Sequence, residues 1–153
     1  MSERLIAITL DKKTTGGGSH LLDLERTRAV ADLLDANHFA PAGLTGPYTL
    51  HLGVREGRLV FSLASENITN AHIITLPLKP LRGIIRDYFL ICESYHEAVK
   101  QGGAARIEAV DMGRRGLHNE GAEELIALLA SKITVDFDTA RRLFTLLCVL
   151  HIK

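Results

Sequence analysis

The stretch YTLHLGVREGRLVFSL, Tyr48 to Leu63, alternates apolar and polar side chains on both sides of a short polar break. Successive side chains of a strand point to opposite faces, so this period of two predicts two half-buried strands. The break, Arg55 to Arg58, has the length of a tight turn and offers Gly57 where a positive φ is wanted. The sequence therefore predicts an antiparallel hairpin whose buried face comprises Tyr48, Leu50, Leu52, Val54, Leu59, Phe61 and Leu63.

Strands are also expected on either side of this hairpin. Ala71 to Leu76 predicts a third strand, which would extend the hairpin into an antiparallel meander. Leu5 to Leu10 is a short apolar stretch and predicts a strand that could be covered on both faces. A polar loop, Lys12 to Ser19, follows it and leads into a helix that ends near Ala36 and is capped by Ser19 or Asp23.

A long amphipathic helix is predicted from Pro80 to the Gly102-Gly103 pair. Its apolar residues recur every three or four positions, as one stripe of a helix requires. The stripe consists of Leu81, Ile84, Ile85, Tyr88, Cys92, Tyr95 and Val99. We expect this stripe to cover one side of the sheet.

Shorter elements are predicted in the remainder of the chain. Ala104 to Met112 and Glu120 to Ser131 predict two helices, separated by a break at the glycines 113 and 116. Ile133 to Phe137 alternates like a strand, and Asp138 is expected to cap a final helix. That helix is apolar nearly all round from Leu143 to Leu150, which predicts burial in the chain's own core or between copies of a homo-oligomer.

Together these elements predict one globular domain, residues 1–153, of the α+β class. The expected architecture is an antiparallel meander of about three to four strands packed against four to five helices.

Composition excludes several classes of function. Lys plus Arg and Asp plus Glu number 18 each, so the chain has no global field that would attract nucleic acid or a membrane surface. Cys92 and Cys148 lie in apolar runs, which favours reduced, buried thiols in a cytoplasmic protein. No apolar run approaches the roughly 20 residues that span a bilayer. No cofactor is indicated.

Two patterns resemble known sites but do not meet their requirements. Lys12 to Ser19 is glycine-rich, yet it lacks the lysine followed by Ser or Thr that a phosphate-binding loop needs after its glycines. Glu93 and His96 have the spacing of metal ligands on a helix, but the second copy that a two-metal bundle needs is missing. We therefore predict a loop and a surface pair, and no metal site.

The stretch DMGRRGLHNEGAEEL, residues 111–125, is the best candidate site. If the chain breaks at its glycines, Asn119 caps the next helix and the exposed amides could hold a phosphate or carboxylate. Arginine binds such groups in bidentate fashion. The predicted ligand-binding residues are Arg114, Arg115, His118, Asn119 and, from the final helix, Arg141.

A purely structural role for this stretch is favoured over a ligand site. Asp111 can pair with Arg115 four residues later, and the glutamates 120, 123 and 124 weaken any anion-attracting field. Arginine in the first turn of the final helix opposes the helix dipole, so a carboxylate of the chain, Asp136 or Asp138, is expected to answer Arg141.

Two functions remain open. The favoured one is a noncatalytic binding or regulatory module that contacts an anionic metabolite or an acidic partner, and that self-associates through its final helix. The alternative is a small enzyme acting on a phosphorylated substrate, with His118 as general acid or base oriented by Asp111 or Glu120. The enzyme requires a carboxylate within about 3 Å of His118 in a concave pocket, whereas the module predicts a flat or convex patch.

Three long runs of the chain resemble one known family. They are RDYFLICESYHEAVK, IEAVDMGRRGLHNEG and VDFDTARRLFTLLCVLHIK, which begin at residues 86, 107 and 135. They are similar to sequences of an alphaproteobacterial group, the uncharacterised protein family 0262. The resemblance covers nearly the whole chain and implies a bacterial cytosolic protein, but it carries no activity and no site residues.

Overall fold

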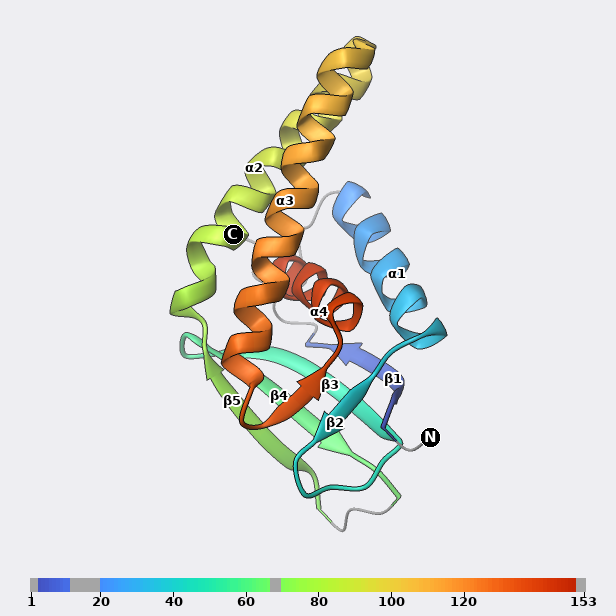
Figure 1. Ribbon diagram of the computed structural model, residues 1–153, viewed down its shortest axis with the longest axis vertical. Helices are drawn as coiled ribbons and strands as arrows, with labels where there is room; N and C mark the ends of the chain where they lie inside the picture. The colour runs from blue at the N-terminus through green and yellow to red at the C-terminus, as the bar shows by residue number, and fades with distance from the viewer. Residues whose placement is uncertain (1–2, 12–19, 67–69, 151–153) are drawn as a thin grey trace.

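The computed structural model describes residues 3–11, 20–66 and 70–150, and the side chains of the first helix from residue 24 onward. The elements are, in chain order, β1 (Leu5–Leu10), α1 (His20–Asp35), β2 (Phe39–Pro41), β3 (Tyr48–Arg55), β4 (Arg58–Ala64), β5 (His72–Pro77), α2 (Lys79–Gln101), α3 (Ala104–Leu129), β6 (Ile133–Val135) and α4 (Phe137–Leu150). The helices lie together on one side of the main sheet (Figure 1). The predicted α+β class is therefore confirmed.

The main sheet has four strands in the order β1-β3-β4-β5. Strands β3, β4 and β5 form the predicted antiparallel meander. The turn between β3 and β4 places Glu56 at φ 53° and Gly57 at φ 74°, the two positive values that a tight hairpin turn of this kind requires. Strand β1 joins in parallel beside β3, so the sheet is mixed, which alternation along the chain could not indicate.

One face of the sheet is apolar and buried, and the opposite face is half-buried to exposed. The hairpin residues predicted for the buried face are buried, apart from half-buried Val54 at the strand end. The sequence allowed strand β1 to be covered on both faces, and it is not. Leu5 is fully buried, but the side chain of Ile6 is 54% exposed because β1 is an edge strand and the helices cover one face only.

Helix α2 follows the prediction closely. Pro80 lies in its first turn, and Gly102 ends it in the left-handed conformation at φ 77°. Most of the apolar stripe faces the core, but Val99 is 48% exposed. The reason is visible in Figure 1, where the distal part of the α2–α3 hairpin extends beyond the rest of the molecule.

Helix α3 corrects the prediction of two short helices. It runs without a break through 26 residues, and Gly113, Gly116 and Gly121 are all inside it. Packing gives a reason for two of these glycines. A Cβ at Gly113 would lie 3.3 Å from the Ile91 side chain, and one at Gly121 would lie only 2.5 Å from the Phe144 ring. Close helix contacts thus outweigh the poor helix propensity of glycine.

Helix α4 is the centre of the fold and lies among α1, α3 and the sheet (Figure 1). Every residue from 143 to 150 is buried by the chain itself. Burial in the core therefore accounts for its all-round apolar sequence, and the self-association predicted through this helix gains no support from a single chain. Asp136, and not Asp138, is its cap, because Asp136 Oδ1 accepts a hydrogen bond from the Thr139 amide at 3.0 Å.

A second, two-stranded sheet pairs β2 with β6 in antiparallel fashion. Strand β6 confirms the strand predicted for Ile133 to Phe137, but it is shorter. It ends at Val135, because Asp136 caps helix α4. Strand β2 was missed, since no strand was predicted between the end of the first helix near Ala36 and Tyr48. The loop predicted for Lys12 to Ser19 lies outside the described residues. Within the described part of the chain, no helix is long and apolar enough to cross a membrane.

Candidate functional site

A cavity of about 170 Å³ opens between helices α1, α3 and α4. It is lined by Glu25, Arg28, Ala29, Asp32, Arg114, His118, Arg141, Arg142 and Thr145. Four of these side chains are arginines, contributed by three different helices. We call this cavity the arginine pocket.

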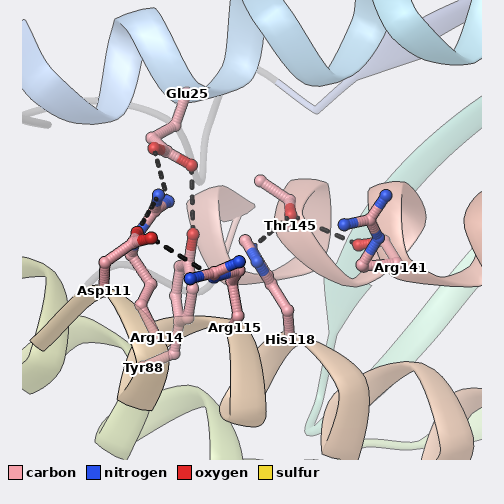
Figure 2. Close-up of polar contacts among 8 residues, drawn as sticks. All are labelled: Glu25, Tyr88, Asp111, Arg114, Arg115, His118, Arg141 and Thr145. Atoms are coloured by element: carbon pink, nitrogen blue, oxygen red, sulfur yellow. Dashed lines mark hydrogen bonds and ion pairs between the residues drawn. The ribbon is translucent and has the colours of Figure 1, made fainter. Parts of the chain in front are cut away.

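Arg114 reaches from α3 across to α1. Its guanidinium lies 2.9 Å from Asp111 Oδ1 and 3.5 Å from Glu25 Oε2 (Figure 2). It also lies over the Tyr95 ring, at 5.1 Å from the ring centre. The hydroxyl of Tyr88 donates a hydrogen bond to the other Glu25 oxygen at 3.0 Å. Burial raises the pKa of Tyr88 well above its ordinary value, so this donor keeps its proton. The contacts tie α1 to both helices of the hairpin.

His118 lies in the wall of the pocket, between Tyr88 and Thr145. Its ring centre is 4.7 Å from that of Tyr88, and its Nε2 atom is 3.0 Å from the Thr145 hydroxyl (Figure 2). The same hydroxyl donates to the carbonyl oxygen of Arg141 at 3.2 Å. Since threonine has a single hydroxyl proton, Nε2 of His118 carries the ring proton and donates it to Thr145.

His118 is uncharged at neutral pH. Burial, followed by the nearby charges of Arg114 and Arg141, lowers its pKa from 6.5 to about 4. The positive charge of the arginine pocket therefore comes from its arginines alone. Asp111 acts in the opposite direction but does not reverse the effect.

The arginines of the pocket are unequally paired. Arg114 has two carboxylate partners, while Arg141 reaches one, Asp138, at 3.5 Å. Within the described residues, Arg28 and Arg142 form no ion pair, and the buried Nε atoms of Arg114 and Arg141 have no hydrogen-bond partner. Four arginines thus face two carboxylates, Glu25 and Asp32, in the pocket lining.

The residues predicted for a ligand site divide into two groups. Arg114, His118 and Arg141 meet in the arginine pocket. Arg115 and Asn119 do not line it; Arg115 is 61% exposed and pairs with Asp111 at 3.2 Å, as expected for residues four apart. The predicted second helix start, with its exposed amides, is absent because α3 is continuous over Ala104–Leu129. Asn119 therefore lies inside the helix and does not cap it. The expected carboxylate partner of Arg141 is confirmed as Asp138.

Several residues of the pocket were not predicted. Glu25, Arg28 and Asp32 belong to α1, about 90 residues before the predicted site, and no motif connects the two segments. Thr145 did leave a signal, since a hydroxyl stands inside the apolar run of α4. A buried hydroxyl needs hydrogen-bond partners, and Thr145 has two, the carbonyl oxygen of Arg141 and the ring of His118.

The geometry gives little support to His118 as an acid–base catalyst. Its hydrogen-bond partner is a hydroxyl, and in the described part of the chain no carboxylate contacts it. Asp111 is engaged with two arginines, and Glu120 is exposed on α3. The flat or convex patch predicted for a binding module is also wrong, because the three predicted residues meet in a cavity.

The fold and the site together define an α+β protein with an arginine-lined pocket between its helices. Residues 2–153 match the model of the uncharacterised protein family UPF0262, and the chain belongs to this family. It is 53% identical over 150 residues to the UPF0262 protein of Maricaulis maris. This match covers 97% of this chain and 94% of the relative.

Two further relatives match the chain over a similar length. The UPF0262 protein of Brucella canis is 52% identical over 152 residues, covering 97% of this chain and 93% of its own. That of Xanthobacter autotrophicus is 49% identical over 154 residues, covering 99% and 94%. No solved structure matches the chain.

Proposed function

We propose that the arginine pocket binds a small anionic group, a phosphate or a carboxylate, and that the protein is a noncatalytic binding or regulatory module. The observation that carries this proposal is the presence of Arg28 and Arg142 in one cavity without a carboxylate partner among the described residues. Guanidinium groups bind phosphate and carboxylate through paired N–H donors. An anion in the pocket would supply the acceptors that the described residues do not.

The concave shape favours a small anion over an acidic protein surface. A cavity encloses a compact group and excludes water around it, which strengthens charge-assisted hydrogen bonds. Glu25 would oppose an anion, but its two oxygens are already engaged by Arg114 and Tyr88.

Catalysis is the weaker alternative. A general base is most effective when its pKa lies near the working pH, and the pKa of His118 is about 4. His118 therefore suits a neutral hydrogen-bonding group in the wall of the pocket.

The proposal is tested by thermal unfolding in sodium phosphate and in sodium chloride of equal ionic strength. At a phosphate concentration about ten times Kd, binding adds about 1.4 kcal/mol of stability, which corresponds to a Tm rise of about 4 °C. The R28Q/R142Q variant should lose most of this rise. The matched control is R115Q, which removes an arginine of α3 outside the pocket and should keep it.

Two results would contradict anion binding. One is the absence of any phosphate-specific rise in the unsubstituted protein. The other is an equal rise in the R28Q/R142Q variant, because the effect would then arise elsewhere on the molecule.

A further inference from the structure

A second cavity of about 170 Å³ adjoins the arginine pocket between α1 and the α2–α3 hairpin. It is lined by Leu24, Glu25, Arg28, Cys92, Tyr95 and Arg114. Three residues, Glu25, Arg28 and Arg114, line both cavities. The two cavities therefore meet at the Glu25–Arg114 ion pair, as two ends of one groove beside α1.

The residues that belong to the second cavity alone are apolar in character. They are Leu24, Cys92 and Tyr95. Burial raises the pKa of the Cys92 thiol to about 11, so it presents an uncharged sulfur at neutral pH. Tyr95 presents an aromatic ring whose face is approached by the Arg114 guanidinium. The two ends of the groove thus differ in chemistry, one cationic and one apolar.

Leu24 stands out in this arrangement because 54% of its side chain is exposed. It lies on α1 at the edge of the second cavity and does not belong to the apolar core. An apolar group bound in this cavity would cover part of the Leu24 side chain and remove apolar surface from water.

We propose that the natural ligand is an amphipathic anion, whose phosphate or carboxylate enters the arginine pocket and whose apolar or aromatic group enters the second cavity. This inference rests on the proposed function, since it assigns the anionic end of the ligand to the same pocket. Arg28 and Arg114, which line both cavities, would contact the junction between the two parts of the ligand.

The test compares the affinities of phenyl phosphate and methyl phosphate by titration calorimetry. Both compounds carry the same phosphate, so their difference reports the second cavity alone. Burying the ring should make phenyl phosphate bind about tenfold more tightly. In the L24S variant this preference should shrink to about threefold or less, while methyl phosphate binds as before.

A matched control is L90S. Leu90 is a similarly exposed leucine, at 57%, on α2 and lines neither cavity, so its substitution should leave the preference intact. The R28Q/R142Q variant should weaken both ligands.

The possible failures are distinct. Equal affinities for the two phosphates, or a preference that L24S leaves unchanged, would overturn the amphipathic ligand but leave anion binding standing. If neither phosphate binds, both proposals are wrong.

Discussion

The Nε2 atom of His118 lies 3.0 Å from Oγ1 of Thr145, and this contact joins the middle of α3 to the central helix α4. Both partners are largely withdrawn from solvent; Thr145 is 6% exposed. A protonated imidazole at this position would stand close to Arg114 and Arg141 in a poorly hydrated environment. The arrangement therefore favours the neutral ring.

The neutral state of His118 makes stability depend on pH in the acidic range. Its pKa is lowered from 6.5 to about 4 in the folded chain, so between these values the unfolded chain binds a proton that the folded chain does not. Stability should therefore fall as the pH decreases from about 6.5 to about 4, by up to about 3 kcal/mol. Above pH 6.5 this effect is absent.

The measurement is the urea midpoint of the unsubstituted protein and of H118Q at several pH values from 4 to 8. Glutamine can still hydrogen-bond Thr145 but does not titrate. The difference between the two proteins should change across the acidic window and be constant above it. A constant difference at all pH values would mean that His118 titrates normally in the fold.

Two glycines of α3 should respond to alanine in opposite directions. A Cβ at Gly116 meets nothing within 4 Å, whereas one at Gly121 lies 2.5 Å from the Phe144 ring. G116A should stabilise the protein by up to about 1 kcal/mol through helix propensity. G121A should destabilise it by about 1–3 kcal/mol through overpacking. Denaturant unfolding of both variants measures these changes, and a destabilising G116A would argue against a continuous helix at this point.

The hydroxyl of Tyr88 should contribute to the attachment of α1. It donates to the Glu25 carboxylate at 3.0 Å from a side chain that is 1% exposed. Y88F should therefore cost about 1.5–3 kcal/mol, the usual range for a hydrogen bond to a charged group. Y95F is the matched control, because the Tyr95 hydroxyl makes no hydrogen bond with a described residue. Equal losses in the two variants, measured by urea unfolding, would show that the Glu25 contact is not the cause.

The cap of α4 gives a prediction that separates two neighbouring aspartates. D136A removes the acceptor of the Thr139 amide and should cost about 1 kcal/mol. D138A removes only a half-exposed contact with Arg141 at 3.5 Å and should cost less than about 0.5 kcal/mol. Thermal unfolding in low salt checks both values, and a larger loss in D138A would contradict the assignment of the cap.

The sequence predicted those parts of the fold that depend on local pattern. Alternation from Tyr48 onward was sufficient for the hairpin, and Pro80 and Gly102 marked the ends of α2. The parallel pairing of β1 and the continuity of α3 were not predictable in this way. Both depend on contacts between distant segments, such as Gly121 against Phe144, which override local propensity.

The sequence predicted only the part of the candidate site that depends on local pattern. Arg114 and His118 lie one turn apart on α3, so their proximity follows from helix geometry. The contribution of Arg28 depends on how α1 packs across α4, and the sequence has no pattern that reports this packing. The stretch from 111 to 125 is part of one continuous helix and not the predicted break between two helices. The expected Asp111–Arg115 ion pair is present, and one side of the stretch forms a pocket wall.

The central position of α4 has a consequence for synthesis of the chain. The sheet and helices α1, α2 and α3 all precede Phe137 in the chain, so the ribosome synthesises them before the central helix α4. Until that last segment emerges, the apolar undersides of α1, α3 and the sheet have nothing to close upon and are open to non-native association. Native packing of α1, α3 and the sheet therefore cannot be completed before α4 has been synthesised.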